Sequence, residues 1–196
     1  MEKVQTGRVI EFYSNSCLVE LNGLNVKCSI LGKQDIVVGD FVNLEYQNDN
    51  DAKSALIISR SDRSSELTKK EIRGLKVIAA NISHVGILLV QNPTTSCEFI
   101  DKWIASSKAS NIEPFIINNK IDVAMSDEYL EKVSLYKNIG IKIFNISAKE
   151  NIGLKDLIEY LKNKCTIFVG NSVAGKSTLT SMLTWINIKT KDLSNN

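Results

Sequence analysis

The amino-acid sequence predicts an N-terminal all-β barrel of the OB-fold type, followed by an α/β P-loop domain. Three observations lead to this fold class. Short β-type runs separated by turn residues fill residues 7–60, strand and helix patterns alternate from Val77 onward, and the apolar run Thr166–Val169 leads into a phosphate-loop motif. With 196 residues, 43% of them hydrophobic, the chain can bury the cores of two compact units.

Residues 1–62 are expected to form the barrel. Helical patterns are absent between most of the β-type runs, and turn residues such as Asn22-Gly23 and Gly39-Asp40 separate them. Five short strands of this kind are typical of a small closed barrel, most commonly an OB fold. The runs are Arg8–Phe12, Ser16–Leu21, Asn25–Ile30, Asp40–Tyr46 and Ser54–Ser59.

An OB barrel often binds oligonucleotides, although the same fold also serves as a plain packing module. Residues 1–66 hold seven Lys and Arg against ten Asp and Glu, which gives this part a net charge of −3. Neutralisation of phosphates alone therefore does not hold the barrel on RNA, and both interpretations stay open.

Residues 63–76 are polar and are expected to form a linker or a surface loop between the two domains. A solvated charged face is the default interpretation of such a run. Its four basic residues lie close together along the chain, however, and can also follow a phosphate backbone. These possible RNA contacts are Lys69, Lys70, Arg73 and Lys76.

Residues 77–196 show the alternation of a doubly wound α/β sheet, in which ligands bind beyond the carboxyl ends of the strands. The run His84–Val90 is continuously apolar, as strands buried on both faces of a parallel sheet are. The other expected elements are a helix over 98–110, a strand over 114–117, a helix over 127–138, a strand over 142–146, a helix with the apolar stripe Leu154, Leu157, Ile158 and Leu161, and the strand Thr166–Val169.

The stretch that follows Val169 matches G-x-x-x-x-G-K-[ST] and leads into helix-forming residues. Backbone N–H groups of such a loop can surround phosphates at the positive end of the helix. Lys176 is expected to reach the terminal phosphates, and the Ser177 hydroxyl is expected to ligate Mg²⁺. A chance match is the alternative, and the strand before the loop argues against it. The expected phosphate-binding residues are Gly170, Asn171, Ser172, Val173, Ala174, Gly175, Lys176, Ser177 and Thr178.

Two further motifs follow strands of the same predicted sheet: N-K-x-D in Asn119-Lys120-Ile121-Asp122, and S-A-K in Ser147-Ala148-Lys149. The Asp122 carboxylate can accept two hydrogen bonds from the N1–H and 2-amino groups of guanine, which adenine cannot supply. The Lys120 stem can lie against the base, Asn119 can link the base loop to the phosphate loop, and the Ala148 N–H can bond the guanine carbonyl. An ATP-dependent P-loop kinase is disfavoured, because it would leave both motifs without a role.

The composition excludes several other classes. The four cysteines are scattered without a C-x-x-C pair and His84 is the single histidine, which argues for reduced thiols and against zinc. No apolar h-region follows the N-terminus, and the longest apolar runs are too short to cross a bilayer. The net charge of +2 is too small to prove a nucleic-acid partner. We therefore expect a soluble, cytoplasmic protein.

The base motifs precede the phosphate loop, which reverses the order found in Ras-like GTPases. A site built from loops at one sheet edge tolerates this permutation if the new termini fall on the surface. A barrel followed by such a domain resembles the ribosome small subunit-dependent GTPase A family (RsgA, also called YjeQ) over essentially the whole chain. The resemblance is carried by Gly7-Arg8-Val9, Val38-Gly39-Asp40, Ala79-Ala80-Asn81, the N-K-x-D and S-A-K motifs and the phosphate loop.

This resemblance implies a circularly permuted P-loop GTPase domain in a ribosome biogenesis factor. The family binds the maturing small ribosomal subunit and its rRNA, and hydrolyses GTP to time its own release. Catalysis is then mostly positioning and charge stabilisation, which the ribosome stimulates. The implied catalytic residues are Lys176 and Ser177, Ser177 is the implied Mg²⁺ ligand, and the implied cofactors are GTP or GDP with Mg²⁺. A monomer without membrane contact is expected.

Three departures from the family modify these expectations. The chain ends at Asn196, so we expect the switch regions and the zinc-binding domain of the family to be absent and the GTPase domain to be incomplete. Val173 stands where the family normally has Gly, which at positive φ would cost about 1–3 kcal/mol. The strand Thr166–Val169 would become a sheet edge. We therefore expect a poor GTPase, and the alternative is a non-enzymatic remnant that binds ribosome, rRNA or guanine nucleotide without efficient hydrolysis.

Overall fold

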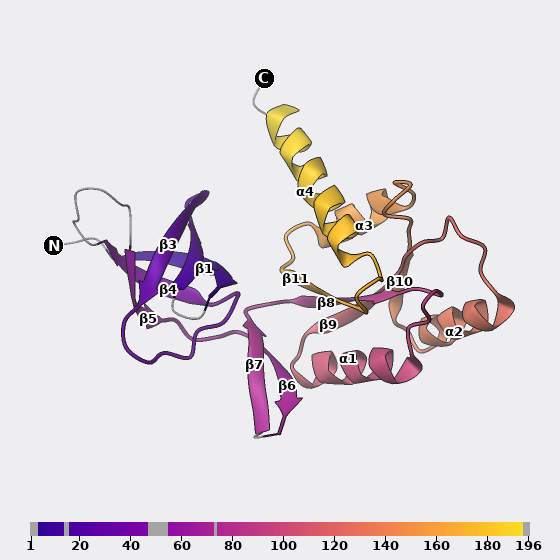
Figure 1. Ribbon diagram of the computed structural model, residues 1–196, viewed down its shortest axis with the longest axis horizontal. Coiled ribbons are helices and arrows are strands. Elements are labelled where there is room, and N and C mark those ends of the chain that lie inside the picture. Colours follow the sequence, from indigo (N-terminus) through magenta and orange to yellow (C-terminus); the bar gives the residue numbers. More distant parts are fainter. Residues whose placement is uncertain (1–3, 14–15, 47–54, 73, 194–196) are drawn as a thin grey trace. The chain divides into compact units, whose positions relative to one another are not determined.

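The computed structural model describes residues 4–13, 16–46, 55–72 and 74–193, with the side chains of the last helix described through residue 184. The chain divides into two compact units, residues 1–82 and 83–196 (Figure 1). The sequence predicted a boundary within residues 63–76, whereas the structure assigns these residues to the first unit. The reason is the hairpin described below.

The first unit contains a closed barrel of five strands, as the sequence predicted. Its strands are β1 (Gln5–Phe12), β2 (Ser16–Leu21), β3 (Leu24–Ile30), β4 (Phe41–Tyr46) and β5 (Ala55–Arg60). β1, β2 and β3 follow one another as antiparallel neighbours, β5 lies between β3 and β4, and β4 pairs with β1 to close the barrel. Alternate side chains point inward, and Val9, Val19, Val42, Leu44 and Ile57 are buried there. Ser54, the predicted first residue of the last run, lies outside the described residues.

Residues 66–80 form an antiparallel hairpin of β6 (Glu66–Glu71) and β7 (Gly74–Ala80), where the sequence predicted a linker over 63–76. That prediction is wrong. The two strands lack the alternation of apolar and polar residues that indicates a strand, because the buried residues are concentrated at the base of the hairpin. Leu67, Ala79 and Ala80 are buried at the base, whereas Ile72 and Leu75 are exposed near the tip. Backbone pairing and this buried base therefore specify the hairpin, although most of its side chains are polar.

Arg63 joins the base of the hairpin to the barrel. Its side chain is 4% exposed, and Nε donates to Oδ1 of the fully buried Asp40 at 2.7 Å. The same guanidinium reaches the carboxylates of Asp35 and Glu66 at 3.2 and 2.9 Å. The side-chain amide of Asn81 also donates to the backbone carbonyl of Gly39, just before β4. Since burying a carboxylate is costly unless it is paired and hydrogen-bonded, this cluster ties the hairpin base to the barrel.

The second unit is a parallel four-stranded sheet with helices on both faces (Figure 1). The elements are β8 (His84–Leu89), α1 (Cys97–Ala109), β9 (Glu113–Asn118), α2 (Asp127–Asn138), β10 (Lys142–Asn145), α3 (Leu154–Leu161), β11 (Thr166–Val169) and α4 (Lys176–Leu193). The strand order is β10-β9-β8-β11, with all neighbours parallel. Helices α1 and α2 lie on one face, and α3 and α4 lie on the other. Within the described residues, β11 is the last strand at its end of the sheet.

The helices begin where the sequence provides capping groups. The hydroxyls of Ser96 and Ser126 accept hydrogen bonds from the backbone N–H groups of Phe99 and Tyr129, which lie in the first turns of α1 and α2. Gly140 follows α2 with a φ of +83°, as is common just after a helix C-terminus. These caps fix the ends of the loops that enter and leave each helix.

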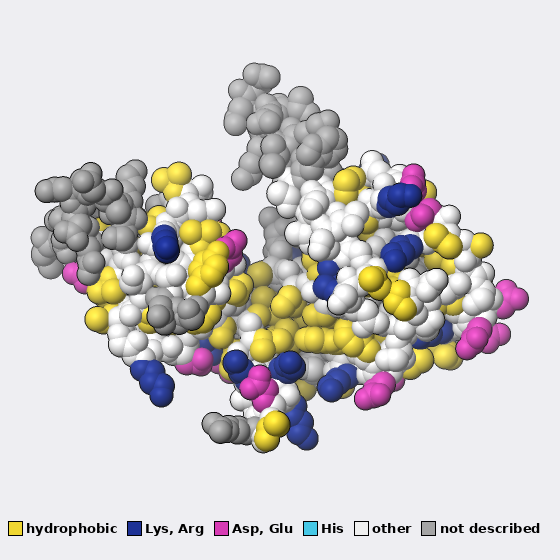
Figure 2. Space-filling model, in the orientation of Figure 1, with side chains coloured by type: hydrophobic (Ala, Val, Ile, Leu, Met, Phe, Trp, Pro, Cys, Tyr) yellow, Lys and Arg dark blue, Asp and Glu magenta, His cyan; other side chains and the backbone are white. Residues whose placement is uncertain are grey.

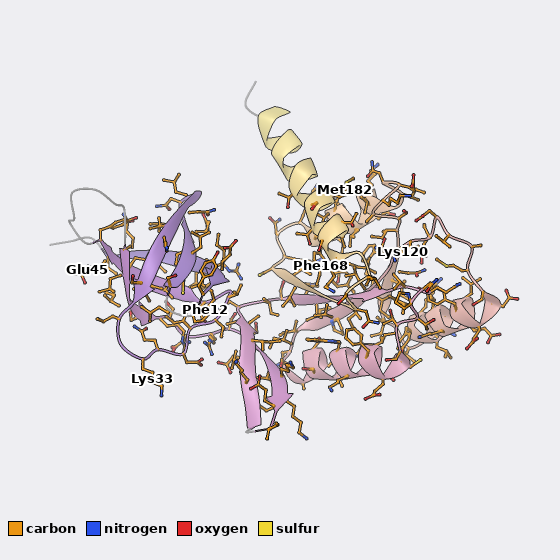
Figure 3. The ribbon with its side chains drawn as sticks, viewed as in Figure 1. Phe12, Lys33, Glu45, Lys120, Phe168 and Met182 are labelled. Atoms are coloured by element: carbon orange, nitrogen blue, oxygen red, sulfur yellow. The ribbon has the colours of Figure 1, made fainter. Side chains whose placement is uncertain are left out.

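The core of the second unit lies directly beneath the loops at the carboxyl ends of the strands. Leu88, Phe115 and Ile117 are fully buried in it. Phe168 on β11 and Met182 on α4 pack against the same cluster (Figure 3). Each large apolar side chain contributes about 1.5–3 kcal/mol when buried. The loops above the core therefore start from strand ends that buried side chains hold in place.

Candidate nucleotide-binding site

Three loops meet at the edge of the sheet where the parallel strands end. They follow β9, β10 and β11, and they carry the N-K-x-D motif, the S-A-K motif and the phosphate loop, respectively. Parallel strands that are neighbours end on the same side, which is also the side on which α/β sheets bind ligands. The topology thus brings together the motifs that the sequence singled out.

The phosphate loop runs from Gly170 to Gly175, between β11 and α4. A Cβ at Gly170 would lie 2.9 Å from Cβ of Leu88, and one at Gly175 would lie 2.5 Å from Nδ2 of Asn119. Gly175 also has a φ of +92°. Side chains at these two positions would collide with Leu88 and Asn119, so glycine lets the loop pack closely against β8 and the base loop.

Val173 does not carry the strain that the sequence raised as a possibility. It is not among the residues with positive φ, and its side chain is 51% exposed. The left-handed position of the loop is Gly175 instead. A β-branched residue is therefore accommodated at position 173 without the cost of a left-handed backbone.

Lys176 and Ser177 open helix α4. The Lys176 ammonium donates to the backbone carbonyls of Gly170 and Asn171 at 2.5 and 2.8 Å, so it lies across the phosphate loop. The side chains of Ser177 and Thr178 are exposed in the first turn of the helix. N–H groups at a helix N-terminus carry partial positive charge and attract anions. An exposed hydroxyl there is the kind of oxygen donor that Mg²⁺ accepts alongside phosphate oxygens.

Asn119 connects all three loops. Its Nδ2 donates to the backbone carbonyl of Ala174 in the phosphate loop at 2.9 Å, and its Oδ1 accepts from the N–H of Ala148 at 3.1 Å. The side chain is 3% exposed. The expected link between base loop and phosphate loop is confirmed. The Ala148 N–H, which the sequence suggested could bond a guanine carbonyl, donates to Oδ1 of Asn119 in this structure.

Lys120, labelled in Figure 3, is half-buried in the loop after β9, and Asp122 in the same loop is exposed. Lys120 has a φ of +67°, and its ammonium lies 3.5 Å from the backbone carbonyl of Asn92. A hydrogen bond from Ser147 lowers the pKa of the Asp122 carboxyl, with smaller contributions from Lys149 and Lys120. Asp122 is therefore ionised at neutral pH and can act as an acceptor of hydrogen bonds.

The S-A-K loop is held by its own backbone. Ser147 is buried and exchanges backbone hydrogen bonds of 3.0 Å with Ile152 in both directions. Its hydroxyl also accepts from the N–H of Glu150 at 3.1 Å. The backbone N–H of Ile121 donates to Ile146 at 3.2 Å, so the two base loops run beside each other. Lys149 is exposed, with its ammonium 3.2 Å from the Glu150 carboxylate.

Sequence patterns missed two polar side chains that support the base loop. Asn118 is a buried polar residue that ends the apolar strand β9, and it hydrogen-bonds Tyr129 and Asn145. Gln91 follows β8, and its Oε1 accepts from the N–H of Ser126 at 2.8 Å. The available signal was a polar amide at the carboxyl end of an apolar strand, which is where the sheet rule places functional groups.

The basic residues of the hairpin belong to the first unit. Lys69, Lys70 and Lys76 are exposed, and Lys76 lies 4.0 Å from the Glu71 carboxylate. Arg73, the fourth predicted RNA contact, lies outside the described residues. Figure 2 shows Lys side chains on the hairpin beside hydrophobic ones near its tip. The three lysines therefore project from the strands β6 and β7 into solvent.

Over the described ranges, no three His, Cys, Asp or Glu side chains gather closely enough to hold a metal ion. No helix in the part of the chain that the structure describes is both long and apolar enough to cross a membrane.

Comparison with known proteins identifies relatives of the whole arrangement. The family model described as RsgA GTPase matches residues 60–196. The small ribosomal subunit biogenesis GTPase RsgA of Flavobacterium psychrophilum is 34% identical over 191 residues, covering 89% of this chain and 59% of that protein. The protein of the same name from Hahella chejuensis is 34% identical over 203 residues, covering 98% of this chain and 58% of the relative. The chain thus spans less than two thirds of the length of these relatives.

Two solved structures share the fold. The crystal structure of YjeQ from Thermotoga maritima matches with a TM-score of 0.73 and 29% identity, covering 92% of this chain and 65% of the other. The structure of YloQ, a circularly permuted GTPase, matches with a TM-score of 0.66 and 24% identity, covering 90% and 63%. In both the fold and the order of its motifs, with base loops before the phosphate loop, this chain belongs to the RsgA GTPase family.

Proposed function

We propose that the second unit binds GTP and GDP with Mg²⁺ at the carboxyl-end edge of its sheet. The observation that carries this proposal is the position of Asn119, which hydrogen-bonds the phosphate loop through Ala174 and the S-A-K loop through Ala148. One buried amide thereby fixes the spacing between the groups for the base and the groups for the phosphates. Such fixed spacing is what allows a site to recognise a whole nucleotide rather than a phosphate alone.

Guanine is the proposed base because Asp122 offers an ionised carboxylate beside Ser147. The carboxylate accepts from N1–H and the 2-amino group, the stem of Lys120 covers one face of the base, and Ile121 and Lys149 complete the two loops. A base that lacks these donors leaves the carboxylate unpaired, which costs affinity. The site thus distinguishes guanine from adenine by hydrogen-bond pattern.

The phosphates are proposed to lie against the phosphate loop and the first turn of α4, from Gly170 to Thr178. Backbone N–H groups and the first turn of α4 hold the oxygens, while the Lys176 ammonium moves from loop carbonyls to the terminal phosphates. Ser177 would hold Mg²⁺ together with phosphate oxygens, and the ion supplies neutralisation of the phosphate charge. Lys176 and Ser177 are therefore the proposed catalytic residues of this chain.

The biological role that fits this family is hydrolysis of GTP coupled to maturation of the small ribosomal subunit. Relatives of this chain are named small ribosomal subunit biogenesis GTPases. The exposed lysines of the hairpin, Lys69, Lys70 and Lys76, supply positive charge for contact with rRNA. We place the protein in the cytoplasm, where the subunit matures, and propose that it acts as a monomer.

The base assignment is tested by Asp122→Asn, measured by displacement of a fluorescent GDP analogue. The variant should bind GDP more weakly and prefer xanthosine diphosphate, because an amide can donate to the xanthine oxygen where the carboxylate accepted. Asp127→Asn makes the same chemical change at an exposed position in the first turn of α2 and serves as the control. An unchanged base preference in Asp122→Asn would contradict the proposed guanine site.

Turnover is measured separately from binding. GTP hydrolysis with and without purified small ribosomal subunits should show stimulation by the subunit, and Lys176→Ala should abolish it. Tight GDP binding without subunit-stimulated hydrolysis would instead support the binding module without efficient hydrolysis.

A further inference from the structure

A buried polar network lies beneath the two base loops. Nδ2 of Asn118 donates to Oδ1 of Asn145 at 2.9 Å, and the hydroxyl of Tyr129 donates to Oδ1 of Asn118 at 2.6 Å. Asn118 is 2% exposed and Tyr129 is 3% exposed. The three residues come from β9, α2 and β10, which are the elements that carry both base loops.

Asn118 occupies a place where an apolar residue would be the ordinary choice. It continues the buried run of Ile116 and Ile117 and pairs in register with Asn145 of the neighbouring strand. Burying an amide without partners is unfavourable, whereas an amide whose hydrogen bonds are all made fixes the orientation of its partners. Burial also raises the pKa of the Tyr129 phenol, so the hydroxyl keeps its proton and remains a donor.

The network closes the N-K-x-D loop on itself. That loop leaves β9 at Asn118 and enters α2 just before Tyr129, so the Tyr129–Asn118 hydrogen bond joins its two ends. On the other side, Asn145 precedes the S-A-K loop. Ile121, which lies between the closed ends beside Asp122, donates its backbone N–H to the carbonyl of Ile146, directly before the S-A-K motif, at 3.2 Å. The distance between the two loops therefore depends on both hydrogen bonds of the Asn118 amide.

We propose that Asn118 and Tyr129 are positioning residues for guanine recognition: through Asn145 they set the spacing between the N-K-x-D and S-A-K loops. This inference rests on the proposed guanine site. Neither residue touches the nucleotide, and both act through the loops that do. The network thus sharpens selection for the base and leaves the phosphate loop unaffected.

The test is Tyr129→Phe, which removes only the hydroxyl. Competition against a fluorescent GDP analogue gives the affinities for GDP, for inosine diphosphate, which lacks the 2-amino group, and for tripolyphosphate. GDP should bind about five- to tenfold more weakly. The preference for GDP over inosine diphosphate should narrow, and the affinity for tripolyphosphate should stay within about twofold, a separation that simple destabilisation of the fold would not produce.

A matched control lies on the same helix. The hydroxyl of Tyr136 donates to Oδ1 of Asp101 at 2.9 Å, so Tyr136→Phe removes a buried phenol hydroxyl away from both base loops. Its GDP affinity and base preference should equal those of the wild type. Asn145→Ala, at an exposed position, removes the hydrogen bond between Asn145 and Asn118. It should produce the same loss of GDP affinity and base preference as Tyr129→Phe. It also decides the question if Tyr129→Phe fails to fold, as judged by circular dichroism.

The outcomes distinguish failure of the guanine site from failure of the positioning role alone. A wild-type protein that binds GDP no better than ADP would overturn the guanine site, and with it this inference. A wild type that prefers GDP, together with Tyr129→Phe and Asn145→Ala variants that keep its full base preference, would overturn the positioning role alone. Equal losses for GDP and tripolyphosphate in both variants would also overturn it, because they would show general disruption of the site.

Discussion

Replacing Gly175 with alanine tests the contact that holds the base loop against the phosphate loop. The added Cβ would lie 2.5 Å from Nδ2 of Asn119, which is closer than side chains in folded proteins approach each other. Asn119 has little freedom to move, because it is 3% exposed and hydrogen-bonded to both Ala174 and Ala148. The substitution must therefore displace either this side chain or the phosphate loop.

Two costs add in this variant. The φ of Gly175 is +92°, and a residue with a Cβ in the left-handed region costs about 1–2 kcal/mol. Displacing Asn119 leaves buried polar groups without partners, which costs about 1–3 kcal/mol more. We expect Gly175→Ala to lower the free energy of unfolding of the second unit by about 2–5 kcal/mol. In an Asn119→Ala background only the backbone strain remains, about 1–2 kcal/mol.

Urea unfolding followed by tryptophan fluorescence measures this unit selectively, because Trp103 and Trp185, the two tryptophans of the chain, both belong to it. The two single variants and the double variant form a double-mutant cycle. Gly140→Ala supplies the matched control: its φ is +83°, and no heavy atom beyond its chain neighbours lies within 4 Å of the added Cβ. It should cost about 1–2 kcal/mol, the strain alone.

GDP binding completes the experiment. Gly175→Ala should weaken GDP and tripolyphosphate alike, because it distorts the phosphate loop itself. If Gly175→Ala costs the same within about 0.5 kcal/mol with and without the Asn119 side chain, the two residues are not coupled. In that case the reasoning that one amide joins the base loop to the phosphate loop is refuted.

Three further predictions concern the first unit. Arg63→Met should lower its free energy of unfolding, measured by calorimetry, by about 3–5 kcal/mol, because the buried carboxylate of Asp40 loses its partner. Burial raises the pKa of the Cys17 and Cys28 thiols to about 11 from 9.0. The stability that the neutral thiols provide is complete below pH 9 and is lost as pH rises toward 11, and Cys17→Ala should flatten that decline in urea midpoints. Lys69→Ala should reduce the slope of log affinity against log salt for small-subunit rRNA by about 0.7–0.9.

Each of these has a matched control. Lys162→Met breaks an exposed ion pair with Glu159 and should change stability by less than about 1 kcal/mol, so an equally small effect of Arg63→Met would contradict the role of Arg63. Cys97→Ser removes an exposed thiol and should leave the decline above pH 9 unchanged, and a Cys17→Ala variant with the same decline would contradict the thiol effect. Lys102→Ala on α1 should leave the slope of log affinity against log salt unchanged. A Lys69→Ala variant with the same slope as Lys102→Ala would contradict the RNA contact at Lys69.

Local patterns were sufficient for most of the fold. The helix predicted over 127–138 and the strand Thr166–Val169 have the observed bounds, and the five barrel runs match their strands closely. Apolar runs, period-two alternation and capping residues act within a few neighbours, and burial demands them at fixed spacing. The hairpin over 66–80 escaped this reasoning because Leu67, Ala79 and Ala80 acquire their burial from the base of the hairpin and the barrel.

The motifs of the site were also readable from the chain, since N-K-x-D, S-A-K and the phosphate loop each occupy a few consecutive residues at a strand end. Their order along the chain was enough to indicate a permuted domain. What the motifs could not give was the partner of each side chain. The N–H of Ala148, for example, donates to the side-chain oxygen of Asn119, a partner that no local pattern indicates.

The sequence by itself determined which segments become strands and helices and which residues stand at strand ends, because those properties depend on neighbours along the chain. Only the tertiary structure decided that Asn119 reaches Ala174 across 55 positions, that Asn118 meets Tyr129 and Asn145, and that Arg63 pairs with the buried Asp40. These contacts depend on strand register and on the packing of helices against the sheet, which set distances between segments that no local pattern relates.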